Sequence, residues 1–97
     1  MRFEWNKAKA STNLDKHGVK FELAVTAFDD PFALVTDDSK HSTKTERREW
    51  LMGESDEGVL VVVFTIRNNG KIRRIISARK AKRRERRRYE ESKNIPL

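Results

Sequence analysis

The sequence predicts a one-domain α+β fold with an antiparallel sheet, and three observations lead to it. The segment VLVVVFTIR (59–67) is apolar at nearly every position, which is typical of a central strand. Asn-Asn-Gly follows it and then a second strand-like segment, which together are typical of a hairpin. Helical periodicity appears near the start of the chain, and a charged segment ends it. The length of 97 residues fits one domain with a modest core, and this domain comprises residues 1–97.

The first thirty residues predict a short strand and two helices. RFEW (2–5) is expected to be a short strand, because its alternation of side chains puts Phe3 and Trp5 on one face. Asn6 can cap a helix at 7–17 by accepting a free backbone N–H, and Gly18 suits the left-handed position that ends it. A second helix is expected at about 20–28, where apolar residues recur at helical spacing before Asp-Asp-Pro stops it.

The rest of the chain predicts four strands and one helix. FALVT (32–36) and ERREWLMG (46–53) are the first two strands, separated by a polar loop. The strand at 59–67 and its partner KIRRIISA (71–78) form the hairpin. Ser77 is expected to cap the closing basic helix. The predicted order is therefore β-α-α-β-β-β-β-α, with residues 92–97 as a loose tail.

The hairpin can pair in two registers. A three-residue Asn-Asn-Gly loop pairs Arg67 with Lys71, whereas a two-residue Asn-Gly turn pairs Arg67 with Ile72 and puts Arg74 on its face. The apolar pattern favours the first register. Both registers place at least two cations beside Thr65 on one face of the sheet, where the planar guanidinium of arginine suits a phosphate.

The same cations also fit a simpler interpretation, a sheet face held by surface ion pairs. Glu46 and Glu49 lie on the neighbouring predicted strand and are the expected partners. Spacing alone favours this interpretation over a phosphate site.

The positive charge of the chain is concentrated at its end. Residues 79–97 hold nine of the 22 Lys+Arg and only three of the 15 Asp+Glu, so they carry six of the seven net positive charges. A local basic stripe is typical of a surface that meets nucleic acid or another polyanion. The alternatives are that the stripe is a solvated helix or that it binds an acidic protein partner. A membrane surface is disfavoured, because the stripe has few bulky apolar residues.

Composition excludes several classes of function. The chain has no cysteine, so disulfide and thiolate chemistry are excluded. It has no apolar run near the roughly 20 residues that cross a bilayer, and its first residues lack a signal-peptide core, so we expect a cytoplasmic protein without membrane contact. There is no HExxH motif or glycine-rich phosphate loop and only two histidines, so no metal or cofactor is expected.

Two further residues each have a structural and a chemical interpretation. His17 ends a predicted helix beside Lys16, where both cations complement the helix dipole, but histidine is also the commonest general acid or base near neutral pH. Tyr89 can dock the basic helix on the sheet, or its phenol can meet a base or a phosphate.

Three segments resemble the BrnT family of toxin ribonucleases of bacterial type II toxin–antitoxin pairs. They are FEWNKAKASTNLDKHGVKFELAVTAF, EGVLVVVFTIR and RRIISARKAKRRERRRYEE, which together extend from Phe3 to Glu91. The resemblance implies a RelE-like α+β fold and metal-independent RNA cleavage that inhibits translation and growth. It also implies a ribbon-helix-helix antitoxin of the BrnA type in a 2:2 complex, through which alone the toxin would reach operator DNA.

The resemblance also implies site residues. The motif positions of the family fall here on Lys16, His17, Gly18, Glu46 with Arg47 or Arg48, Arg67, Arg74, Ser77, Arg79 and Tyr89. Two positions depart from the family pattern. Asn6 stands where an Asp is usual. The family usually has a Glu directly before an Arg in the strand that leads to the glycine; in ERREW this pair is either Glu46-Arg47, or Arg47-Arg48 with Arg47 in place of the Glu.

Our hypothesis assigns catalysis to His17, Glu46, Arg67, Arg74, Arg79 and Tyr89. The three arginines would stabilise the phosphate, Glu46 or His17 would act as base, and Tyr89 or Lys16 would position RNA or supply a proton. The basic helix would follow the RNA backbone through Lys80, Arg83, Arg84 and Arg87, beside Lys16. The alternatives are a nucleic-acid-binding module without catalysis and a protein-interaction module that docks an acidic partner.

Overall fold

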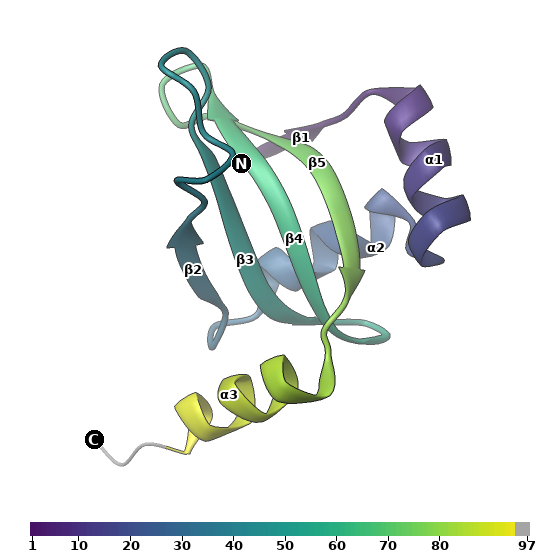
Figure 1. The fold of residues 1–97 in the computed structure, drawn as a ribbon, viewed down its shortest axis with the longest axis vertical. Helices are drawn as coiled ribbons and strands as arrows, with labels where there is room; N and C mark the ends of the chain where they lie inside the picture. The colour runs from purple at the N-terminus through teal and green to yellow at the C-terminus, as the bar shows by residue number, and fades with distance from the viewer. Residues whose placement is uncertain (95–97) are drawn as a thin grey trace.

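The computed structural model describes residues 1–94 as a five-stranded sheet with helices packed on both faces (Figure 1). The strands lie in the order β1-β5-β4-β3-β2. Along the chain, the elements are β1 (Arg2–Glu4), α1 (Lys7–His17), α2 (Phe21–Thr26), the 3-10 turn η1 (Ala27–Asp29), β2 (Leu34–Asp37), β3 (Arg48–Ser55), β4 (Gly58–Arg67), β5 (Ile72–Lys80) and α3 (Arg83–Lys93). The predicted α+β class and order of elements are confirmed.

The sheet is mixed, and the prediction of an antiparallel sheet is wrong at one edge. β1 pairs in parallel with β5, through Phe3 opposite Arg73 and Glu4 opposite Arg74. The other neighbouring strands pair antiparallel. A parallel pair needs a long connection between its strands, and here every other strand and two helices lie between β1 and β5 in the sequence.

The first helix has the predicted bounds and caps. The side-chain oxygen of Asn6 accepts the backbone N–H of Lys9 at 3.0 Å, and Gly18 ends α1 with φ of +68°. The second predicted helix divides into α2 and η1.

The closing helix starts later than predicted, because the strand before it is longer. Ser77 is not its cap: β5 continues to Lys80, paired with Leu60 of β4, and α3 is capped at Lys82. Pairing with a central strand has overridden the local capping signal. At the other end, Ser92 and Lys93 continue α3 instead of starting a tail, and residues 95–97 lie outside the described residues.

The hairpin uses the register that the apolar pattern disfavoured. Arg67 lies opposite Ile72 and Thr65 opposite Arg74, while Asn68 and Asn69 adopt left-handed φ angles in the turn. A β-bulge then shifts the pairing. Phe64 lies opposite Ile75 but Val63 lies opposite Ser77, so Ile76 is the additional residue.

The bulge decides which residues share a face of the sheet. Before it, Arg74 lies on the face of Thr65 and Arg67, and after it Ser77 and Arg79 lie on that same face. We call this face, which carries Thr65, Arg67, Arg74, Ser77 and Arg79, the arginine face.

Two cores hold the helices on the sheet. On the face away from the arginines, α2 and η1 bury Phe21 and Ala24 against Val62 and Ile75, and the ring of Phe28 meets that of Phe64 edge-on at 5.0 Å. On the arginine face, the fully buried Tyr89 of α3 packs with Met52, Val59 and Val61. Helix α3 therefore covers one end of the arginine face and leaves the rest free of helices (Figure 1).

Helix α1 lies along the edge of β5 that β1 leaves unpaired. The side chain of Asn13 is 5% exposed and bonds to both backbone groups of Ala78, donating to its carbonyl at 2.8 Å and accepting its N–H at 3.0 Å. Asn13 also donates to the carbonyl of Val19 at 2.9 Å. One side chain thus replaces the missing strand and fixes the position of α1.

We expect Asn13→Ala to lower the free energy of unfolding by about 3 kcal/mol, because three buried backbone groups lose their partner. Urea denaturation measures this. Ser11→Ala, at an exposed position of the same helix, is the control and should change stability by less than about 0.5 kcal/mol. Equal effects of the two substitutions would contradict the role assigned to Asn13.

Candidate functional site

Two adjoining cavities on the arginine face share one residue, Ser77. The α1 cavity, about 290 Å³, lies between α1 and β5 and is lined by Lys9, Thr12, Asn13, Lys16, His17 and Ser77, among others. The Trp50 cavity, about 310 Å³, lies over β3, β4 and β5 and is lined by Asp38, Trp50, Val61, Val63, Ser77, Arg79 and Glu85. Because Ser77 borders both, the two cavities adjoin at β5, and we refer to the pair as the hollow.

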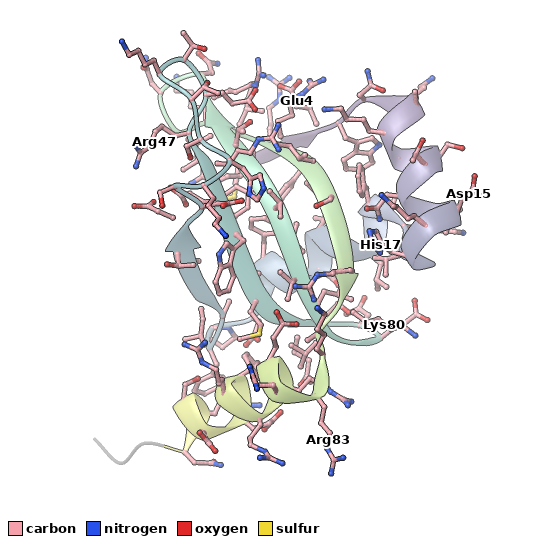
Figure 2. The ribbon with its side chains drawn as sticks, in the orientation of Figure 1. Glu4, Asp15, His17, Arg47, Lys80 and Arg83 are labelled. Carbon is pink, nitrogen blue, oxygen red and sulfur yellow. The ribbon has the colours of Figure 1, made fainter. Side chains whose placement is uncertain are left out.

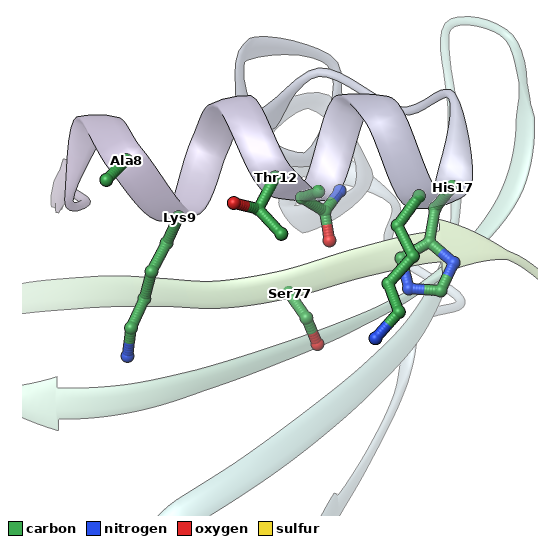
Figure 3. A pocket seen from close by; sticks show the side chains of 7 residues that line it. Ala8, Lys9, Thr12, His17 and Ser77 are labelled. Carbon is green, nitrogen blue, oxygen red and sulfur yellow. The ribbon is translucent and has the colours of Figure 1, made fainter.

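The α1 cavity gathers cations and a histidine from one helix face. Figure 3 shows the side chains of Lys9, Thr12 and His17 extending from α1 toward the strand that carries Ser77. His17 and Lys16 occupy the last turn of α1, where the helix dipole favours positive charge. An exposed imidazole beside a lysine can exchange protons with a bound molecule and attract an anion.

The Trp50 cavity contains an ion pair that is held by two hydrogen bonds. Arg79 donates two hydrogen bonds to the two carboxylate oxygens of Glu85, at 2.8 and 2.9 Å. These bonds lower the pKa of Glu85 to about 2, against the opposing effect of burial, and the backbone N–H of Lys82 adds to the shift. The same pair raises the pKa of Arg79. A guanidinium that holds a carboxylate in this way has the geometry that also holds a phosphate.

The other predicted arginines form a separate group at the turn end of the hairpin. Glu46 accepts a hydrogen bond from Arg48 at 3.1 Å and pairs with Arg67 at 3.5 Å, while Arg74 pairs with Glu4 at 2.6 Å. These contacts agree with the ion-pair interpretation of the face, with Glu46 as a partner. The second expected partner, Glu49, lies opposite Phe64 and so faces the other side of the sheet.

The structure therefore does not bring the three predicted phosphate-binding arginines together. Arg79 lies opposite Val61 of β4, and Arg67 is six residues farther along that strand, a separation of about 20 Å at ~3.3 Å per residue. Two groups result. Lys16, His17, Ser77 and Arg79 border the hollow, whereas Glu46, Arg67 and Arg74 lie at the turn end.

Tyr89 lines neither cavity and lies inside the contact between α3 and the sheet. It is fully buried, and its hydroxyl donates to the carboxylate of Asp30. Burial and that hydrogen bond raise the pKa of Tyr89. Asp30 also accepts the backbone N–H groups of Glu54 and Phe32, which together with Tyr89 outweigh burial and lower its pKa. This placement agrees with the packing interpretation of Tyr89.

The basic stripe forms a surface of its own. Lys80, Arg83, Arg84 and Arg87 are exposed, and none of them pairs with a carboxylate of residues 1–94. Figure 2 shows Arg83 directed away from the sheet. Of the predicted RNA-binding residues, only Lys16 lines the hollow.

Among the residues of the hollow that were not predicted as site residues, Asp38, Trp50 and Glu85 bear on its chemistry. Trp50 gives a usable signal in the sequence, because an indole at the end of the charged segment ERREW is an amphipathic side chain that is rarely fully buried. Asp38 and Glu85 give none, since their roles depend on contacts between distant elements.

Neither a metal-binding cluster nor a membrane-crossing helix is found in the described part of the chain. Within residues 1–94, no three His, Asp or Glu side chains are placed to hold one metal ion. None of the helices in this range is long and apolar enough to cross a bilayer.

Residues 5–85 match the model of a protein family described as the ribonuclease toxin, BrnT, of type II toxin–antitoxin systems. The matched range covers most of the chain and includes both cavities. No curated protein matches the chain.

The Arg79–Glu85 pair generates a prediction about pH. The folded-state pKa of Glu85, about 2, lies below its ordinary value of 4.5, so the pair stabilises the fold above pH 4.5 and loses this effect as the pH falls toward 2. Glu85→Gln should therefore be less stable than the wild type at pH 6, and the difference should shrink to near zero at pH 2. Urea denaturation at several pH values measures it. A difference independent of pH would contradict the assignment.

Proposed function

Because the chain belongs to the BrnT family of ribonuclease toxins of type II toxin–antitoxin systems, we propose that it cleaves RNA without a metal ion in the hollow beside Ser77. The observation that supports this location is the shared border of the two cavities. His17 and Lys16 face the hollow from α1, and Arg79 faces it from β5. In our proposal one bound phosphate lies between His17 and the guanidinium of Arg79.

The chemistry needs three kinds of group, and the hollow supplies them. The 2′-hydroxyl of the ribose attacks the adjacent phosphorus while a base removes its proton, the P–O5′ bond breaks, and an acid gives a proton to the leaving 5′-oxygen. The products are a 2′,3′-cyclic phosphate and a 5′-hydroxyl end. In our proposal His17 transfers a proton, Lys16 supplies positive charge or the second proton, and Arg79 stabilises the charge on the phosphoryl oxygens.

The group at the turn end takes a different role in this proposal. Arg67 lies about 20 Å from Arg79 along β4, at ~3.3 Å per residue, and Arg74 pairs with Glu4, so we assign both to the RNA backbone at another nucleotide. Glu46 is the alternative base, with the reaction then centred at Arg67. Tyr89 anchors α3 without touching RNA.

The basic surface of α3 extends the contact beyond the hollow. We propose that Lys80, Arg83, Arg84 and Arg87 attract the RNA backbone, since these exposed cations have no carboxylate partner within residues 1–94.

A type II toxin has an antitoxin partner. We propose that the antitoxin is a ribbon-helix-helix protein of the BrnA type in a 2:2 complex, which covers the toxin and carries it to operator DNA. Cleavage would take place in the cytoplasm and would inhibit translation and growth. The RelE-like fold implied by the resemblance belongs to the same proposal.

The first test is cleavage of a defined single-stranded RNA in EDTA. The wild type should cut and leave 2′,3′-cyclic phosphate ends, and His17→Gln should cut about 10²–10⁴ times more slowly, as is typical when a general acid or base is removed. Asp15→Asn is the control, because Figure 2 shows Asp15 on the side of α1 turned away from the sheet.

Three other outcomes would change the proposal. Full activity of a folded His17→Gln variant together with an inactive Arg67→Ala variant would move the reaction to the turn end, with Glu46 as base. Cutting by the wild type only when a divalent metal is added would overturn metal independence. Binding of RNA without cutting by the wild type would favour the nucleic-acid-binding module.

A second test concerns Arg67. Arg67→Ala should weaken RNA binding and lower the slope of log affinity against log salt concentration by about 0.7, the value for one phosphate contact on a single strand. Arg73→Ala is the matched control, because Arg73 lies opposite Ile66 on the other face of the same hairpin. Equal slopes for Arg67→Ala and the wild type would remove Arg67 from the RNA surface.

A further inference from the structure

We infer that the Trp50 cavity is a base-binding subsite selective for guanine. In this subsite the base stacks on the indole of Trp50, and its N1–H and N2–H groups donate to the carboxylate of Asp38. The inference rests on the proposed function in one respect, that the bound base belongs to an RNA whose phosphate lies at Arg79. It goes beyond that function by naming the nucleotide.

The platform for stacking is fixed by the sheet. Trp50 lies in β3 between Val63 of β4 and Thr36 of β2, and it packs against the core under α3. It is only partly buried and lines a cavity of about 310 Å³. An aromatic side chain on a rigid strand, with one side open to a cavity, is a recurrent means of holding an unpaired base.

The acceptor for the base is also held in place. The side chain of Asp38 is 16% exposed and lines the same cavity as Trp50. Its backbone N–H donates to the carbonyl of Arg48 at 2.9 Å, and its own carbonyl accepts the hydroxyl of Ser42 at 2.7 Å. Nδ1 of His41 lies 3.0 Å from each carboxylate oxygen. Each oxygen of a carboxylate can accept two hydrogen bonds, so both keep capacity for a ligand.

The chemistry of Asp38 selects among the four bases. A carboxylate is an acceptor only, and its two oxygens match two adjacent donors. Guanine alone has two adjacent N–H donors on its Watson–Crick edge. Adenine and cytosine place a ring-nitrogen acceptor next to the amino group, and uracil places a carbonyl on each side of its one N–H, so each would set a lone pair against the second oxygen of Asp38.

The cavity also has a partner for the phosphate of the same nucleotide. Arg79 lines it from β5, and its guanidinium already makes a two-point contact with a carboxylate, that of Glu85. The cavity therefore combines an aromatic face, an acceptor for the base edge and a donor for the phosphate. These are the three kinds of contact that one nucleotide needs.

Tryptophan fluorescence tests the inference without any need for catalysis. The chain has two tryptophans, so Trp5→Phe leaves Trp50 as the only emitter. In this background 5′-GMP should quench the emission at concentrations about ten times lower than AMP, CMP or UMP, the discrimination typical of one two-point base contact. Asp38→Asn should abolish this preference, because its amide group opposes one donor of guanine.

The matched control is Asp37→Asn, whose carboxylate is 65% exposed, pairs with Arg47 and belongs to the opposite face of the sheet. It should keep the preference for GMP. If Trp5→Phe disturbs the fold, calorimetric titration of the wild type, Asp38→Asn and Asp37→Asn with the four nucleotides replaces the fluorescence. Equal affinity of the wild type for all four nucleotides, or an unchanged preference in Asp38→Asn, would overturn the inference.

The test also separates the inference from the proposed function. An RNA-cleaving wild type without a preference for GMP would leave the function standing and remove the guanine subsite. A wild type that prefers GMP and loses the preference in Asp38→Asn, yet cuts no RNA, would establish the subsite and remove the proposed catalysis.

Discussion

The contact between Asn13 and Ala78 is the constraint on which the arrangement of this molecule depends. β1 protects only the first residues of β5, and the side chain of Asn13 satisfies the backbone at the point where the edge would otherwise be open. The same contact determines where α1 lies. Asn13 is the only fully buried residue of α1, and with Ala10, which packs against the core, it fixes the position of Lys16 and His17 beside Ser77.

The β-bulge at Val63 and Ser77 is the second constraint, and it determines which side chains of β5 lie on each face of the sheet. A strand shifted by one residue turns every later side chain to the other side of its sheet. Without the bulge, Ser77 and Arg79 would lie on the face covered by α2, and Ala78 would leave the core. A local irregularity in β5 therefore creates the hollow, in agreement with the tendency of bulges to occur beside functional sites.

The sequence was sufficient for local features and insufficient for those that depend on distant contacts. The cap at Asn6, the end at Gly18 and the central strand β4 follow from side-chain chemistry and periodicity. The bulge, the parallel pairing of β1 and the late start of α3 depend on which strand lies beside which, and periodicity does not encode that. Likewise, His17 and Arg79 were identified as candidates, but only the structure shows that they line two adjoining cavities and that Arg67 lines neither.

The two-point bond between Arg79 and Glu85 also bears on turnover. Glu85 is part of the same chain, so it competes with any bound phosphate at a high effective concentration that dilution does not reduce. A phosphate that binds Arg79 has to displace the carboxylate of Glu85 or share the guanidinium with it. When the phosphate dissociates, the carboxylate binds the guanidinium again. In the proposed reaction, an intramolecular competitor of this kind would weaken the binding of substrate and product alike and would shorten the time for which a cleaved end occupies the guanidinium.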